Sequence, residues 1–178
     1  DVELREYENG IDISSEVINK RADFGVSSSS LILDKLQNKP VVLIASYFKQ
    51  NALALAVKPE ITSVSQLKGK KIMAVDYEID HTSIGVLLKE ARLKRSDYTL
   101  IDHDFDIEKF KDGEVDAISI FITNQPYFLD KKGIDYNILN PADFGIYSYD
   151  LELFTSKELA LLNPEMVKNF VKATNMGW

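Results

Sequence analysis

The sequence predicts an α/β fold, and two observations about its residues lead to that prediction. Short apolar runs of strand length alternate with segments in which apolar residues recur at helical spacing. Apolar residues make up 45% of the 178 residues and charged residues 28%, which is typical of a globular protein. The length suits one ordinary domain or two small lobes. We therefore expect strands separated by helices along the whole chain.

The first part of the chain contains the most apolar of the predicted strands. Residues 41–48 and 52–57 are almost wholly apolar, which is typical of strands buried on both faces of a sheet. Ser63 and Gln66 have the spacing of a capping box, which predicts a helical turn over residues 63–67. The elements expected before these are a strand at 2–7, a helix at 13–21, a strand at 24–26 and a helix at 31–37.

The second part continues the alternation with clear stop and start signals. Asp112 and Gly113 end a predicted helix, while Asn163 and Pro164 place a cap and a first-turn proline before the last one. The predicted strands are 71–75, 98–102, 117–122, 136–139 and 151–155. The predicted helices are 82–93, 107–111, 125–132, 159–162 and 165–174.

Composition excludes several classes of function. A net charge of −7 argues against a nucleic-acid or anionic-membrane partner. The chain has no cysteine, which excludes disulfides, thiol nucleophiles and thiolate metal sites and fits an extracytoplasmic protein. No run of about 18 apolar residues is present, so no membrane span is expected.

The resemblance to a known family rests on five segments taken in order. They are KRADFGVSSSS (20–30), KPVVLIASYFKQNALALAVK (39–58), SVSQLKGKKIMAV (63–75), KDGEVDAISIFITNQPYFLDKKGI (111–134) and LELFTSKELALLNPEMVKNFVKATNMGW (151–178). Together they resemble the type II periplasmic solute-binding fold, in the branch named for thiamine-pyrimidine-precursor binding and synthesis. The ITNQP and LFTS stretches are most similar to receptors fused to membrane-anchored histidine kinases or diguanylate cyclases.

This resemblance implies a two-lobed, Venus-flytrap α/β domain with hinge strands that closes on a ligand. Lobe one would comprise residues 1–68 and 147–178, and lobe two residues 69–146. Family members usually begin with a further strand and helix and end with further helices, so lobe one is expected to be truncated.

The implied function is that of a periplasmic sensory module of a membrane signalling protein. The alternative is the soluble binding component of an ABC transporter, in which case a permease replaces the signalling domain as partner. A thiamine-pyrimidine synthase-like enzyme is disfavoured because the cysteine motif of that relative is missing, and no catalytic signature replaces it. A degenerate domain that binds nothing is a further alternative. No catalytic residue, no cofactor and no oligomeric state is predicted.

Two candidate ligand corners lie in lobe one, where strands end before helices. The first is Ser27, Ser28 and Ser29, whose hydroxyls and backbone N–H groups either hold a polar ligand or only cap the next helix. The second is Tyr47, Phe48 and Gln50, an aromatic and amide group suited to a flat heterocycle.

Lobe two offers a dense polar cluster in AVDYEIDHTS, with Asp76, Tyr77, His81 and Thr82 as candidate contacts. Three interpretations stay open: helix capping, a carboxylate that binds an amine or amidine, and a metal site. A metal is disfavoured because the chain has only two histidines and they are far apart in sequence.

Three further residues complete the predicted site: Phe121 and Asn124 after an apolar strand, and Tyr147 near the predicted hinge. Asn124 serves either as a donor to a ligand or as a helix cap, and Tyr147 either lines the cleft or packs the hinge. The combination suits a small organic ligand, an amino-substituted heterocycle or a zwitterion.

Overall fold

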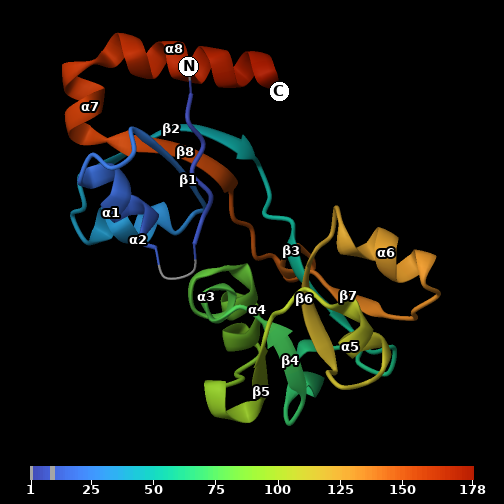
Figure 1. Ribbon diagram of the computed structural model, residues 1–178. Helices are drawn as coiled ribbons and strands as arrows, with labels where there is room; N and C mark the ends of the chain where they lie inside the picture. Colours follow the sequence, from blue (N-terminus) through green and yellow to red (C-terminus); the bar gives the residue numbers. More distant parts are fainter. Residues whose placement is uncertain (1, 9–10) are drawn as a thin grey trace. The chain divides into compact units, whose positions relative to one another are not determined.

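The chain forms two compact units, shown in the computed structural model in Figure 1, which describes residues 2–8 and 11–178. Unit 1 is Asp1–Lys49 with Tyr149–Trp178, and unit 2 is Gln50–Ser148. The boundary differs from the predicted lobes, since residues 50–68 belong to unit 2 and not to the unit that contains both ends of the chain. The described part of the chain contains no helix long and apolar enough to cross a membrane.

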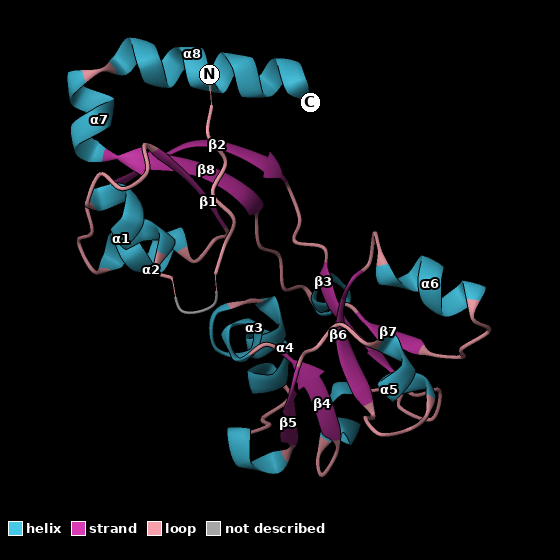
Figure 2. Ribbon diagram, in the orientation of Figure 1, coloured by secondary structure: helices cyan, strands magenta, loops and turns pink. Residues whose placement is uncertain are grey.

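Unit 1 is built on a three-stranded antiparallel sheet (Figure 2). Its order is β1 (Phe24–Ser27), β8 (Asp150–Ser156) and β2 (Val41–Phe48), so β8 is the central strand of the described sheet. The helices of this unit are α1 (Ile13–Ile18), α2 (Leu31–Leu36), α7 (Lys157–Leu162) and α8 (Pro164–Gly177). Asn163 caps α8 through a hydrogen bond from the Met166 N–H, as the Asn-Pro signal predicts.

Helices cover both faces of this sheet (Figure 1). On one face Phe154 is fully buried and packs with Val17, Leu31 and Val41 beneath α1 and α2. On the other face α8 lies against β1, where the rings of Phe24 and Phe170 stack at 3.9 Å.

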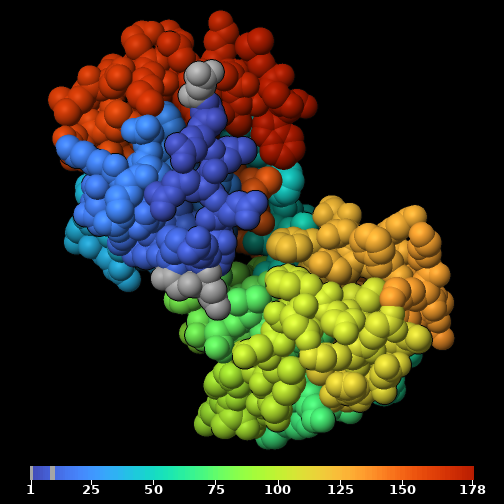
Figure 3. Space-filling view, viewed as in Figure 1, coloured from blue at the N-terminus to red at the C-terminus, as the bar shows by residue number. Residues whose placement is uncertain are grey.

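Two predictions for unit 1 are wrong. Residues 2–7 form no strand, and most of their surface is exposed; in the space-filling view they lie on the outside of unit 1 (Figure 3). The strand prediction read local composition only, and a strand also needs a neighbour to complete its hydrogen bonds. The second error concerns β2, which is mostly half-buried or exposed and not buried on both faces, because it lies at the edge of the sheet and pairs with β8 alone among the described strands.

Unit 2 is built on a five-stranded mixed sheet in the order β5, β4, β6, β3, β7. These strands are β3 (Leu53–Val57), β4 (Lys71–Ala74), β5 (Thr99–Asp102), β6 (Ala117–Phe121) and β7 (Asn137–Leu139). The helices are α3 (Asp76–His81), α4 (Ser83–Glu90), α5 (Ile107–Lys111) and α6 (Gln125–Lys131), and short 3-10 turns occur at Val64–Leu67, Arg95–Asp97 and Pro141–Phe144. β4 runs parallel to β5 and β6, whereas β3 runs antiparallel to β6 and β7.

The alternation of side chains along β3 explains the two cores of unit 2. Leu53, Leu55 and Val57 point to the face covered by α4, while Ala54 and Ala56 point to the opposite core around Phe110 and Ile118. Every residue of β3 is buried, as its apolar composition predicts for a strand covered on both faces. Because β3 pairs with strands on both sides, residues 50–68 are held in unit 2.

Candidate functional site

The serines after β1 are bonded mainly to one another. Ser27 Oγ lies 3.3 Å from Ser30 Oγ, and the Ser28 hydroxyl donates to Ser30 Oγ at 3.2 Å. Ser29 donates to the Tyr149 carbonyl at 2.6 Å, which ties this turn to the start of β8. Ser30, the N-cap residue of α2, makes no side-chain capping bond. Ser28 Oγ also accepts the Ser30 N–H at 3.4 Å, so these serines bind both one another and the backbone before α2.

Tyr47 and Phe48 are held by the end of α8. The Tyr47 hydroxyl donates to Asn175 Oδ1 at 2.9 Å, and its ring stacks on Trp178 at 5.4 Å. Phe48 meets the same indole edge-on at 5.8 Å and keeps 37% of its surface exposed. Phe48 thus offers an aromatic surface beside β8, while the polar end of Tyr47 is already engaged.

Sequence reasoning missed a buried acid in unit 1. Glu152 on β8 is only 5% exposed and stands in register with Ser27 of β1 and Ser46 of β2. Burial raises the pKa of its carboxyl, and the charge of Asp150 raises it further. Burial also raises the pKa of Asp150, although a hydrogen bond from the Leu151 N–H opposes that shift. The available signal was an acid between two leucines, Leu151 and Leu153, in a predicted strand.

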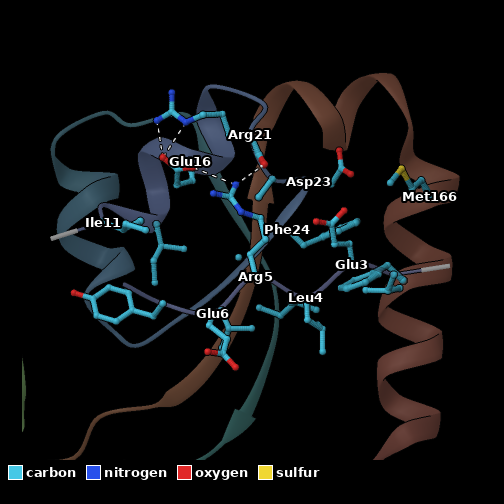
Figure 4. A pocket seen from close by; sticks show the side chains of 18 residues that line it. Glu3, Leu4, Arg5, Glu6, Ile11, Glu16, Arg21, Asp23, Phe24 and Met166 are labelled. Atoms are coloured by element: carbon cyan, nitrogen blue, oxygen red, sulfur yellow. Dashed lines mark hydrogen bonds and ion pairs between the residues drawn. The ribbon is translucent and has the colours of Figure 1, made fainter. Parts of the chain in front are cut away.

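A groove of about 790 Å³ lies in unit 1, between residues 2–7, β1 and α8 (Figure 4). Arg5 donates to Glu16 at 3.3 Å and to the Arg21 carbonyl at 2.9 Å, while Arg21 also donates to Glu16. The hydrogen bond from Arg21 lowers the pKa of Glu16. None of the predicted ligand residues lines this groove. The charged side chains of Arg5, Glu16 and Arg21 in this groove are therefore already engaged in the hydrogen bonds given above.

In unit 2 the predicted cluster forms a helix that the sequence analysis did not expect. Asp76 begins α3 and lies 3.7 Å from Arg95, with 72% of its side chain exposed. Tyr77 packs against His81 at the end of the same helix, with ring centroids 4.9 Å apart. Thr82 accepts a hydrogen bond from the Ile84 N–H and so caps α4. Capping is therefore the role of Thr82, and Asp76 and His81 are exposed.

A second acid, Glu78, organises the carboxyl ends of β4 and β6. Its Oε2 accepts hydrogen bonds from the Val75 N–H at 3.0 Å and from the Ser119 hydroxyl at 2.6 Å. His103 Nε2 lies 2.9 Å from the Ser119 carbonyl, and its Nδ1 accepts from the Phe105 N–H. Because Nδ1 is an acceptor, the ring hydrogen belongs on Nε2. This network fixes the edge where β5, β4 and β6 end, which is where open sheets bind ligands.

The remaining predicted residues of unit 2 are exposed. Phe121 ends β6 and is 43% exposed, and Tyr147 is 72% exposed. Asn124 is the N-cap residue of α6 but makes no capping bond with its side chain. Gln50, the first residue of unit 2, is exposed as well. Among the described residues no cluster of three or more histidine and acidic side chains could hold a metal ion.

A model of the family described as NMT1/THI5 like matches residues 1–178. The chain belongs to the NMT1/THI5-like family. A search of the curated proteins finds no match to this NMT1/THI5-like sequence.

Solved structures that match this fold include periplasmic sulfonate-binding proteins and a substrate-binding protein of an ABC uptake transporter. A sulfonate-binding protein from Methylobacillus flagellatus matches with a TM-score of 0.65 at 21% identity, over 86% of this chain and 48% of its own. The aliphatic sulphonate-binding protein SsuA from Escherichia coli matches with a TM-score of 0.63 at 19% identity, over 88% and 52%. A histidine-bound ABC substrate-binding protein from Streptococcus pneumoniae matches with a TM-score of 0.58 at 18% identity, over 92% and 67%.

These likenesses confirm the predicted fold class, a two-lobed α/β periplasmic binding protein of type II. This NMT1/THI5-like chain spans about half the length of the two sulfonate-binding proteins. The more specific resemblance to receptor domains of sensor kinases or cyclases finds no counterpart among these structures.

Proposed function

We propose that this chain is the ligand-binding part of an extracytoplasmic solute-binding protein that serves an ABC transporter. The observation that carries the proposal is the fold, which this chain shares with binding proteins whose names assign them to ABC uptake systems. Two polar clusters add to it: Glu152 between two serines in unit 1, and the Glu78 network at the carboxyl edge of unit 2. The proposal takes the transporter alternative in place of the sensory module, because the neighbours support a transporter component.

The proposed activity is reversible binding of a small organic solute without chemical conversion. The absence of cysteine removes the thiol chemistry of the synthase-like relatives. His103, one of the two histidines, is engaged at both ring nitrogens, which leaves it no free nitrogen for proton transfer.

The first test is thermal unfolding of the purified chain in the presence of amino acids, aminopyrimidines, sulfonates and purines. A ligand at about a hundred times its dissociation constant adds about 2.7 kcal/mol to the free energy of unfolding. For a chain of this size that corresponds to a rise in Tm of about 5–10 °C. A cooperative transition that no compound shifts would contradict the proposal and support a degenerate domain.

A second test separates transport from sensing once a solute is found. Deleting the gene in its native host should abolish uptake of the radiolabelled solute at low external concentration. Normal uptake combined with loss of a transcriptional response to the solute would replace the transporter by a signalling receptor.

A further inference from the structure

The central strand of unit 1 carries a largely buried acid, Glu152. Glu152 lies between Ser27 and Ser46, its register partners on the two neighbouring strands. Side chains alternate along a strand, so Glu152 shares a face with Phe154, which lies in the core under α1 and α2. Its carboxylate therefore points to the polar end of that face, where Ser27 and the serine turn begin.

Within the described chain, the Glu152 side chain makes no hydrogen bond or ion pair, although only 5% of the residue's surface is exposed. The two other acids considered above differ from it. Glu78 accepts hydrogen bonds from Val75 and Ser119, and Glu16 accepts from two arginines. The fully buried side-chain atoms without a partner among the described residues are Ser83 Oγ and Ser148 Oγ, so the Glu152 oxygens still reach the surface of unit 1. A carboxylate that is mostly shielded from water gains stability when a cation pairs with it there.

The charged groups around Glu152 do not supply that partner. On its own strand the nearby titratable group is Asp150, which carries the same charge. The register partners on β1 and β2 are serines, which do not titrate at neutral pH. On α2, Asp34 pairs with Lys39 at 2.6 Å, and Lys35 donates to the Val41 carbonyl at 3.3 Å.

We propose that Glu152, flanked by Ser27 and Ser46, binds the protonated nitrogen of a small organic cation. This inference rests on the proposed solute-binding function and specifies the chemistry of the solute. An amidinium or aminoheterocyclic cation donates two parallel N–H groups, which match the two oxygens of a carboxylate, and the serine hydroxyls accept further N–H groups. Phe48, in register with Asp150, offers an aromatic surface beside the site. A sulfonate or carboxylate group is repelled by the two acids at this position.

The test uses three ligands that share a phenyl ring and differ in charge: benzamidine, benzamide and benzenesulfonate. Each is titrated into the purified chain by calorimetry up to about 10 mM, which is ten times a millimolar dissociation constant. Benzamidine should bind, and benzamide and benzenesulfonate should not. Stronger binding of either of those two, or no binding by any of the three, overturns the inference.

The matched variants are Glu152→Gln and Glu165→Gln. Both remove one negative charge from unit 1, but Glu165 is an exposed residue of α8. Glu152→Gln should weaken benzamidine binding by about 30-fold or more, because it leaves a desolvated cation unpaired. Glu165→Gln should change the affinity less than about twofold, since it alters an exposed charge only. Equal affinities for all three proteins overturn the inference.

A measurement on the unaltered chain covers the case in which Glu152→Gln does not fold. Benzamidine remains protonated at neutral and acidic pH, so its affinity reports the ionisation of the acid that holds it. The affinity should fall as the pH drops through the raised pKa of Glu152. An affinity independent of pH contradicts a carboxylate contact. Failure of the three probes while a metabolite from the wider screen still binds leaves the proposed solute-binding function standing.

Discussion

Gly85 is the residue whose substitution should show most directly how tightly α3 packs on α4. A Cβ at this position would lie 1.9 Å from the Ile79 carbonyl oxygen and 2.9 Å from its carbon. Non-bonded carbon atoms settle at roughly 3.5–4.0 Å, so the backbone of α3 would have to move by more than about 1 Å. Both helices lie beside the Glu78 network, so this packing also positions one of the candidate ligand clusters.

Gly85→Ala should therefore destabilise unit 2 despite alanine's better helix propensity. Overpacking costs typically 1–3 kcal/mol, and the upper part of that range applies because the obstacle is backbone and not a flexible side chain. The higher helix propensity of alanine offsets about 1 kcal/mol of this cost. The net expectation is a loss of about 2 kcal/mol in the free energy of unfolding.

The assay is urea unfolding followed by two signals. Trp178, the only tryptophan, belongs to unit 1, so its fluorescence reports that unit, while far-ultraviolet circular dichroism also follows unit 2. Gly177→Ala is the control, because a Cβ there meets nothing within 4 Å and α8 is helical at that position. The control should be neutral or stabilising by up to about 1 kcal/mol. An unchanged circular dichroism midpoint for Gly85→Ala would refute the close packing of α3 on α4.

Three further predictions concern buried groups. Glu152→Gln should stabilise the chain by about 1–3 kcal/mol near pH 8 but have little effect at a pH below the ordinary glutamate pKa of 4.5. The sign follows from the raised pKa of Glu152 in the native state. As the pH rises, Glu152 ionises in the unfolded state before it ionises in the native state. The native state therefore loses stability until the pH passes the native pKa of Glu152. Urea midpoints at the two pH values check this, and a pH-independent difference contradicts it. Phe154→Ala should cost about 3–5 kcal/mol, measured by Trp178 fluorescence, because the ring is fully buried in the core of unit 1; an unchanged midpoint would mean that this core does not hold the sheet. Ser119→Ala should cost about 1–3 kcal/mol by circular dichroism, because Glu78 loses a charge-assisted hydrogen bond, and a stabilising effect would contradict that bond.

Sequence reasoning succeeded where the local signal and the tertiary environment agree. The apolar strand β3, the capping box at Ser63 and Gln66, and the Asn163 cap of α8 each appear where predicted. It failed where the pairing of strands distant in the sequence determines the local structure and the burial. Residues 2–7 have strand composition but find no strand to pair with in the described chain, and β2 is apolar yet lies at a sheet edge.

The candidate site divides in the same way. The sequence placed polar residues at the ends of β1, β2, β4 and β6, because the end of a strand is marked by small and polar residues. Which of them are free and which are engaged could not be read there: Tyr47 is engaged by Asn175, and Thr82 by α4. Glu78, Ser119 and His103 come from three separate segments, and only the parallel pairing of β4 with its neighbours brings them to one edge.

The sequence by itself determined the α/β class, most of the elements and the family resemblance, because periodicity and caps depend on residues a few positions apart. The tertiary structure decided the division after Lys49 and the isolation of Glu152 between two serines. Both depend on strand pairings between residues far apart in the sequence, such as Leu55 with Leu139 in unit 2 and Ser27 with Glu152 in unit 1. An acid between two leucines becomes unusual only when the strands on either side of it are known to offer no cation.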